Sequence, residues 1–181
     1  MRLKGKRAIV VGAGQTPGDT IGNGRAIATV FAREGAKVLC VDRDLARAEA
    51  TASEIGGVAF EADITAAGAA DAVVAEAVAR FGGVDILVNN VGIGGGGDGP
   101  AHVADEAAFD RIMNVNLKSA WLAIKAATRE LRKGKGAIVN ISSLASLAGA
   151  NMVAYEISKA AMNRLTLSVA LSRSEERRVG K

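Results

Sequence analysis

Residues 7–26, RAIVVGAGQTPGDTIGNGRA, decide the fold that this sequence predicts. The stretch opens with a continuous apolar run, passes through glycine-rich turns and then enters a helical pattern. Continuous apolar runs are typical of parallel strands that are buried on both faces. Glycines between a strand and a helix let the backbone approach a pyrophosphate, which the unpaired N–H groups of the helix terminus attract. The stretch predicts a strand-turn-helix unit that binds a dinucleotide; a purely structural loop is the alternative.

The same alternation of strand and helix continues along nearly the whole chain. Short β-branched runs predict strands at 7–12, 37–42, 58–61, 84–89 and 136–142, and alanine-rich patterns predict helices at 23–34, 44–55, 66–81, 105–132 and 153–171. Strands that alternate with helices form right-handed crossovers and a parallel sheet. We therefore expect an α/β fold, a doubly wound parallel sheet with helices on both faces, in which ligands bind beyond the carboxyl ends of the strands.

Composition narrows the class of protein. With 181 residues and 49% hydrophobic content, the chain can bury the core of one domain, which we place at residues 1–171. The net charge of +4 does not indicate a nucleic-acid partner, and no apolar run is long enough to predict a membrane span. The single cysteine, Cys40, lies in an apolar run and indicates a buried structural thiol. We expect a cytoplasmic protein without a metal site.

Tyr155 and Lys159 form the candidate for acid/base chemistry. Tyr155 is the only tyrosine of the chain, and Lys159 follows it four residues later on a predicted helix. Positions i and i+4 share one helix face, and a nearby cation favours the ionised form of a phenol. The alternative is that an aromatic and a lysine fell one turn apart by chance.

Asp42 ends the second predicted strand, eighteen residues after Gly24. A carboxylate there can accept hydrogen bonds from the adenosine ribose hydroxyls of NAD and would repel the extra phosphate of NADP. Arg43 follows immediately and could tolerate that phosphate. The sequence therefore predicts NAD, with NADP as the alternative.

Taken together, these motifs resemble the short-chain dehydrogenase/reductase family over residues 5–171. Gly12, Gly22 and Gly24 look like the family's three cofactor glycines, with Asn23 between the last two. The family spaces the first two glycines four residues apart, whereas here they lie ten apart. The resemblance thus implies a cofactor loop that is expanded by six residues around 16–20.

Further positions match the family pattern in chain order. Asp63 is similar to the family's adenine-contacting aspartate, and Ile64 would lie beside the adenine ring. Residues 89–92, NNVG, look like the Asn-Asn-Ala-Gly segment after the fourth strand, which implies that Asn90 and Gly92 line the cofactor site. Asn116 matches the asparagine that helps to carry a proton through water.

The resemblance also assigns roles around the candidate pair. Tyr155 would be the catalytic acid/base, and Lys159 would favour its phenolate and bind the nicotinamide ribose. The strand-end pattern selects Ser143 as the serine that holds the substrate oxygen, whereas family spacing from the tyrosine selects Ser142 as the alternative. Glu156 departs from the small residue usual in the family, and its carboxylate either faces solvent or shapes the substrate side of the pocket.

The end of the chain departs from the family as well. Members continue with further strands and a substrate-covering segment, whereas residues 172–181 form a charged stretch without apolar periodicity. We interpret this stretch as a tail foreign to the fold, after a truncation at the carboxyl terminus. The family's usual dimer or tetramer would use helices 105–132 and 153–171.

The sequence thus predicts an NAD(P)-dependent oxidoreductase that transfers hydride between a nicotinamide and a secondary alcohol or carbonyl substrate. In this hypothesis Asn116, Ser143, Tyr155 and Lys159 carry the chemistry. The alternative from another class is a nucleotide-binding fragment without turnover.

Overall fold

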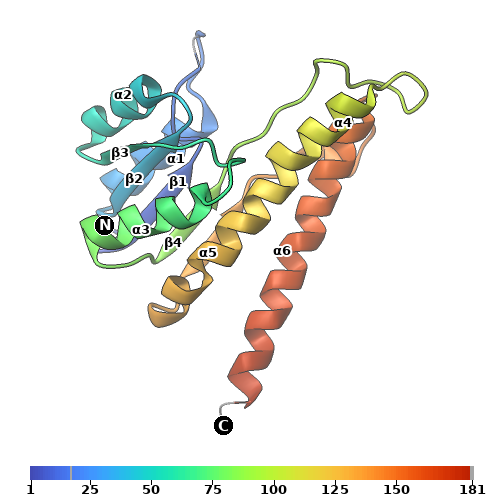
Figure 1. Ribbon diagram of the computed structural model, residues 1–181. Helices are drawn as coiled ribbons and strands as arrows, with labels where there is room; N and C mark the ends of the chain where they lie inside the picture. The colour runs from blue at the N-terminus through green and yellow to red at the C-terminus, as the bar shows by residue number, and fades with distance from the viewer. Residues whose placement is uncertain (17, 180–181) are drawn as a thin grey trace. The chain divides into compact units, whose positions relative to one another are not determined.

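A computed structural model describes residues 1–16 and 18–179 of the chain (Figure 1). The chain divides into two compact units that interleave along the sequence. The first unit holds Met1–Val91 and Leu122–Ile141, and the second holds Gly92–Trp121 and the residues from Ser142 onward. Each unit has its own elements and its own share of the predicted site residues.

The first unit is built on a parallel sheet, which confirms the predicted fold class. Its five strands lie in the order β3-β2-β1-β4-β5, and every neighbouring pair is parallel. The strands are β1 (Arg7–Val11), β2 (Lys37–Asp42), β3 (Val58–Glu61), β4 (Ile86–Asn89) and β5 (Ala137–Asn140). The chain thus starts at the centre of the sheet and winds outward in both directions, as in doubly wound folds.

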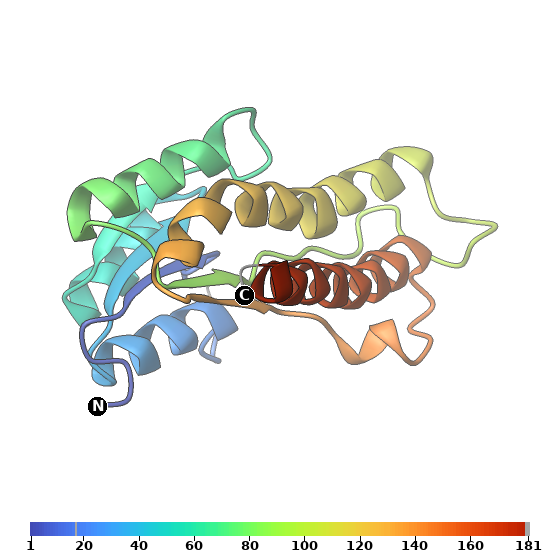
Figure 2. The ribbon, with the colours of Figure 1, turned by 90° about the horizontal axis from the view of Figure 1, so that it is seen from below.

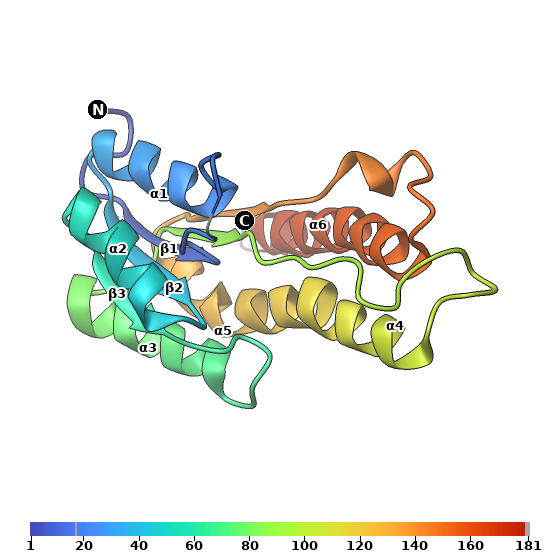
Figure 3. The same ribbon diagram turned by 90° about the horizontal axis from the view of Figure 1, so that it is seen from above.

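Helices cover both faces of this sheet. They are α1 (Asn23–Arg33), α2 (Leu45–Ile55), α3 (Ala69–Phe81) and the larger part of α5 (Ser119–Lys133). Figures 2 and 3 show α1 on one face of the strands and α3 on the other. The strands between them are apolar on both sides, and in β2 the residues from Val38 to Val41 are all buried. In the central strands β1, β2 and β4, where nearly all residues are buried, the continuous apolar run was the right signal, whereas β3 and β5 at the edges of the sheet are only partly buried.

Register brings the carboxyl ends of the central strands to one edge. Val11 of β1 pairs with Val41 of β2 and with Asn89 of β4, so the residues that follow these three strands leave the sheet together. Asp42 closes β2 at this edge, opposite Glu61 of β3. The predicted cofactor residues of the first unit begin at these positions.

The second unit is largely helical. It contains α4 (Glu106–Met113), the π-helical segment η1 (Asn114–Lys118), the short 3₁₀ helix η2 (Leu144–Ser146) and α6 (Val153–Val179). Helix α4 lies beside the first part of α6, and η1 and η2 also contact α6 (Figure 1).

Two helices differ from the sequence expectation. The single helix expected at 105–132 is interrupted by η1, where Ser119 N–H donates to Asn114 O, five residues back. Helix α6 continues to Val179 instead of ending at 171, so the backbone of the expected tail is helical as far as that residue. Gly180 and Lys181, which complete that stretch, lie outside the described residues.

Candidate active site

The glycine turn of the first unit brings three predicted cofactor residues together. Gly12 follows β1 with a φ of +79°, a conformation that glycine adopts without strain. Asn90, which follows β4, donates from Nδ2 to Gly12 O at 2.9 Å. A Cβ atom on Gly24 would lie 1.8 Å from the same carbonyl oxygen and 2.7 Å from Asn90 Nδ2. Only a glycine fits at position 24, because α1 starts in direct contact with the turn.

The start of α1 suits an anionic group. Gly22 is its N-cap residue and has no side chain that could cap the helix. The first turn, which begins at Asn23, contains no acidic residue. A helix of this kind presents unpaired N–H groups and the positive end of its dipole. The residues present therefore fit the pyrophosphate of a dinucleotide.

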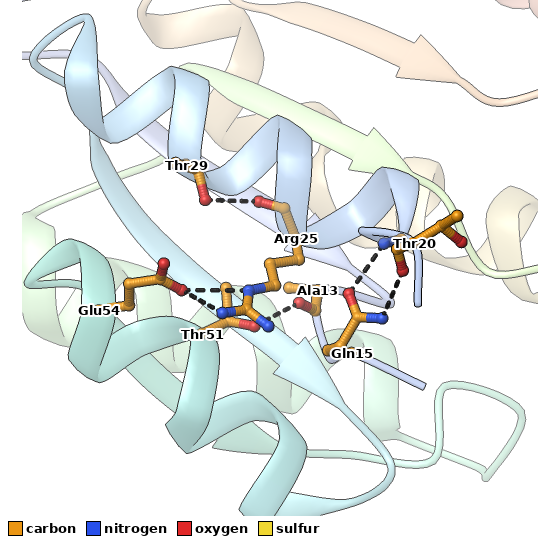
Figure 4. Close-up of polar contacts among 8 residues, drawn as sticks. Ala13, Gln15, Thr20, Arg25, Thr29, Thr51 and Glu54 are labelled. Atoms are coloured by element: carbon orange, nitrogen blue, oxygen red, sulfur yellow. Dashed lines mark hydrogen bonds and ion pairs between the residues drawn. The ribbon is translucent and has the colours of Figure 1, made fainter. Parts of the chain in front are cut away.

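Gln15 closes the expanded loop, a role that the sequence did not predict. Its Nε2 donates to Thr20 O at 3.0 Å (Figure 4). The same atom donates to Thr16 O at 2.6 Å, and Gln15 Oε1 accepts from Gly22 N at 2.8 Å. One side chain thus bonds the backbone of the loop at residues 16, 20 and 22. Pro17, within the expected expansion, lies outside the described residues.

Helix α2 holds the neighbouring parts of the turn in place. Thr51 Oγ1 is fully buried and donates to Ala13 O at 2.9 Å, and Arg25 of α1 bonds Glu54 of α2 at 2.7 Å (Figure 4). Helices α1 and α2 and the turn therefore form one hydrogen-bonded assembly within the first unit. The sequence did not predict the contact of Thr51 with Ala13, because the hydroxyl of a threonine in a helix usually bonds the backbone of its own helix.

Asp42 ends β2 and contacts the glycine turn. Its Oδ2 accepts from Gly14 N at 3.0 Å, and its Oδ1 accepts from Asp44 N at 3.2 Å. A Cβ atom on Gly14 would lie 2.5 Å from Asp42 Oδ2 and 2.7 Å from Arg47 Cβ, so a side chain at position 14 would displace the carboxylate from the turn. A carboxylate oxygen accepts more than one hydrogen bond, which leaves acceptor capacity for a ribose hydroxyl.

Asp63 and Ile64 follow β3. Asp63 Oδ1 accepts from the N–H and the hydroxyl of Thr65, at 2.9 and 2.7 Å, and these hydrogen bonds lower the pKa of Asp63 below its usual value of 3.8. Asp63 is exposed and ionised at neutral pH, whereas the side chain of Ile64 is buried. The Thr65 contacts form an Asx turn that fixes the direction of the carboxylate.

Asn116 is placed by the π-helical segment of the second unit. Its side chain is fully buried. Oδ1 accepts from Ile93 N at 2.8 Å, and Nδ2 donates to Ile93 O and to Ser158 Oγ, both at 2.9 Å. Both N–H groups of the side-chain amide thus have hydrogen-bond partners. A water molecule at Asn116 therefore has to donate to an oxygen of this residue. π-Helical turns occur often at functional sites, and here the turn directs this amide inward.

Tyr155 and Lys159 come together in the first turns of α6. Lys159 Nζ lies 5.7 Å from the centre of the Tyr155 ring. Lys159 is only 3% exposed, and this burial lowers its pKa from the usual 10.5. The geometry confirms that the i and i+4 positions bring the ammonium close to the aromatic ring.

Two glycines in the loop after β4 let that loop lie against Tyr155 and Lys159. A Cβ atom on Gly92 would lie 2.9 Å from Lys159 Nζ, and one on Gly94 would lie 3.4 Å from Tyr155 Cδ2. Gly92 therefore belongs to the surroundings of the candidate acid/base pair. The sequence had assigned it to the cofactor by resemblance.

The two serines after β5 make different contacts. Ser142 Oγ donates to Lys159 O at 3.1 Å, whereas Ser143 Oγ accepts from Ala145 N at 3.2 Å and caps η2. The Ser142 proton is thus used on the backbone of α6. Because Ser143 Oγ accepts in its contact, the Ser143 hydroxyl can still donate its proton to another partner.

Glu156 contacts the backbone that precedes α6. Its Oε1 accepts from Ala150 N at 2.6 Å and from Met152 N at 3.1 Å, and these hydrogen bonds lower its pKa from the usual 4.5. Met152 is the residue before α6, so the carboxylate holds the entry of the chain into the helix. The carboxylate thus has a structural partner that neither sequence alternative included.

Comparison with known proteins points to one family. The family model for the short chain dehydrogenases matches residues 6–179. The chain is 42% identical to 2-(S)-hydroxypropyl-CoM dehydrogenase 3 of Xanthobacter autotrophicus over 93% of its length, and 38% identical to galactitol 2-dehydrogenase of Agrobacterium fabrum over 95%. In both comparisons the chain spans 66% of the relative.

Solved structures agree with the sequence relatives. The crystal structure of a candidate short-chain dehydrogenase/reductase from Burkholderia xenovorans is similar with a TM-score of 0.88 and 41% identity, over 96% of this chain and 71% of that one. Among the described residues, no helix is long and apolar enough to cross a membrane.

Proposed function

Because the chain belongs to the short-chain dehydrogenase family, we propose that it is an oxidoreductase that interconverts a secondary alcohol and a ketone with a nicotinamide cofactor. The observation that carries this proposal is the pair of Tyr155 and Lys159, with the ammonium 5.7 Å from the ring centre. A buried cation beside a phenol favours the form that accepts a proton. Proton transfer of this kind is what alcohol oxidation requires.

The first unit supplies the proposed cofactor residues. The pyrophosphate would lie against the turn and the start of α1, at Gly12, Gly22, Asn23 and Gly24. At position 24 there is room for nothing larger than a glycine. Asp42 would accept from the ribose hydroxyls, which favours NAD over NADP. The resemblance adds Asp63, Ile64 and Asn90 from this unit and Gly92, Tyr155 and Lys159 from the second.

The proposed chemistry divides between the cofactor and the side chains of the second unit. A bound nicotinamide supplies the hydride acceptor or donor. In the oxidation direction, Tyr155 as phenolate takes the proton from the hydroxyl group of the alcohol. At the same time, the C–H bond at the alcohol carbon breaks and gives up hydride. The Lys159 ammonium stabilises the phenolate, and Asn116 anchors the water that returns the proton to solvent.

Ser143 is the proposed contact to the substrate oxygen. Its hydroxyl proton would stabilise negative charge on that oxygen. The contact of Ser142 with Lys159 O supports this choice, because a hydroxyl that donates to the backbone has no second proton to give. Ser142 in turn would help to hold the backbone at Lys159.

The names of the relatives support a substrate class. Their names describe dehydrogenases of 2-hydroxypropyl-CoM and of galactitol at position 2, and both names denote secondary alcohols. We propose a small molecule of the same class as substrate for this chain.

The test compares cofactor binding with turnover in the same preparation. NADH and NADPH are titrated into the parent chain and into Tyr155→Phe by calorimetry, and NAD⁺ reduction is followed with a panel of secondary alcohols. We expect both proteins to bind NADH more tightly than NADPH, and Tyr155→Phe to lose at least about 100-fold in kcat. NADH binding without turnover of any alcohol or ketone would favour the nucleotide-binding alternative.

A further inference from the structure

Asp98 contacts the backbone of the candidate catalytic tyrosine. It lies in the glycine-rich loop between β4 and α4, 57 residues before Tyr155. Its Oδ2 accepts from Tyr155 N at 3.0 Å, and its Oδ1 accepts from Ala154 N at 3.0 Å and from Gly99 N at 2.9 Å. All three contacts lie within the second unit.

These contacts meet a need of the helix that carries Tyr155. The first N–H groups of an α-helix lack partners within the helix and usually bond the side chain of the N-cap residue. The residue before α6 is Met152, which has no oxygen in its side chain. Asp98 supplies the missing acceptors from a distant part of the sequence, and Gly99 O accepts from Val153 N at 2.9 Å.

The loop that presents Asp98 is itself anchored. Arg111 of α4 donates from Nη2 to Gly96 O at 2.6 Å, and Asp105 N donates to Gly97 O at 2.9 Å. Gly94 of the same loop lies against the Tyr155 ring. The loop therefore contacts Tyr155 twice, at its ring and at its backbone N–H.

We propose that Asp98 is a positioning residue that fixes the backbone of Tyr155 and thereby the direction of its phenol. Its consequence for catalysis rests on the proposed function, but the positioning does not. Without this carboxylate the first turn of α6 frays, and Tyr155 lies within that turn. A reacting group displaced by about 1 Å can lose on the order of 100-fold in rate.

The test uses the fact that Tyr155 is the only tyrosine. Labelling the chain with [¹⁵N]tyrosine gives a single backbone amide signal in NMR, and that amide donates to Asp98. Asp98→Asn keeps the size of the side chain but replaces one acceptor oxygen by a donor. We expect the signal to move and its hydrogen exchange to become about 10-fold faster, as for the loss of one charge-assisted hydrogen bond.

Glu156→Gln is the matched control, because Glu156 is also a carboxylate at the start of α6 but bonds Ala150 and Met152. It should change the exchange of the Tyr155 amide by less than about 3-fold, although it removes a capping charge of the same helix. Equal effects of the two variants, or none from Asp98→Asn, would overturn the proposal.

Two further measurements cover a variant that fails to fold and a chain that fails to turn over. In the unmodified chain the Tyr155 amide should exchange slowly, as an amide inside a helix does; exchange at the rate of an open first turn would also overturn the proposal. Where turnover is measurable, Asp98→Asn should lower kcat by about 10-fold to 100-fold with little change in the KM for cofactor. If the Tyr155 amide of Asp98→Asn exchanges faster but kcat is unchanged, Asp98 positions the backbone of Tyr155 without contributing to catalysis.

Discussion

At the scale of single residues, Gly24 is the position of the glycine turn that leaves the least room for a side chain. Gly24→Ala would bring a Cβ atom to 1.8 Å from Gly12 O, a backbone atom, so the turn or the start of α1 has to move. We expect a loss of stability of about 1–3 kcal/mol and at least about 10-fold weaker NADH binding. Urea unfolding and calorimetric titration measure the two effects.

Gly149→Ala is the control for this substitution. A Cβ atom on Gly149 meets no atom within 4 Å, and the residue is exposed. It should leave stability within about 0.5 kcal/mol of the parent. If Gly24→Ala binds NADH as the parent does, the close contact at the turn is not needed for the cofactor.

The role of Lys159 beside Tyr155 can be tested by turnover. Lys159 Nζ lies 5.7 Å from the centre of the Tyr155 ring, and Lys159 is only 3% exposed. Lys159→Met keeps an unbranched apolar stem but removes the charge beside the ring.

Where the parent oxidises a secondary alcohol, we therefore expect Lys159→Met to lower kcat by at least about 10-fold. Lys125→Met, which changes an exposed lysine of α5, serves as the control and should leave kcat unchanged. An unchanged kcat in Lys159→Met would mean that the ammonium does not act on the phenol.

At the scale of secondary-structure elements, Asp85 joins the starts of β1 and β4. Arg7 donates to its carboxylate from Nε at 2.7 Å, from Nη2 at 3.0 Å and from the backbone N at 2.9 Å. Asp85 is 7% exposed, and the Arg7 guanidinium lowers the pKa of Asp85 below its usual 3.8. Asp85→Asn should cost about 2–4 kcal/mol of unfolding free energy at pH 7, because it leaves Arg7 without its charge partner.

The pH dependence of this pair has a definite sign. A carboxylate with a lowered pKa in the folded state contributes stability above its unfolded value, and that contribution is lost as pH falls through the folded value. The difference between parent and Asp85→Asn should therefore shrink below about pH 4. Glu76→Gln, which breaks the surface pair with Arg80 on α3, should cost less than about 1 kcal/mol. Equal losses from Asp85→Asn and Glu76→Gln would contradict this account.

Elements also show why the sequence predicted some features and missed others. All five strands were predicted. The central strands β1, β2 and β4 are largely buried and leave continuous apolar runs, whereas the partly buried edge strands β3 and β5 were found as short β-branched runs. The π-helical turn at Asn116 was missed because its one extra residue hardly alters the apolar spacing of a long helix. At the end of α5, the positive φ of 53° falls on Lys135 and not on the neighbouring Gly134.

Contacts of long sequence separation explain the rest of what was missed. The resemblance named Tyr155, Lys159 and Asn116 because each belongs to a short local motif. Asp98 lies in a run of glycines, and nothing near it in the sequence indicates a partner 57 residues away. Gln15 closes a loop whose length departs from the family, so no family position corresponds to it.

At the scale of the whole molecule, Cys40 reports the opening of the sheet. It is the only cysteine, it is fully buried in β2, and burial raises the pKa of its thiol to about 12. A thiol reagent needs an exposed thiolate, so reaction at pH 8 requires the strands around Cys40 to separate. Labelling under native conditions should follow the fraction of chains in which the sheet has unfolded.

Cofactor binding should then slow this labelling. A ligand that binds only the folded state stabilises it by RT ln(1 + [L]/Kd), which is about 2.7 kcal/mol at 100 times Kd. We expect NADH at that concentration to slow the reaction of Cys40 with a disulfide reagent about 100-fold, and NADPH to slow it less at the same concentration because Asp42 disfavours the extra phosphate. If calorimetry shows NADH binding but labelling does not slow, Cys40 reacts through a local opening that leaves the glycine turn intact.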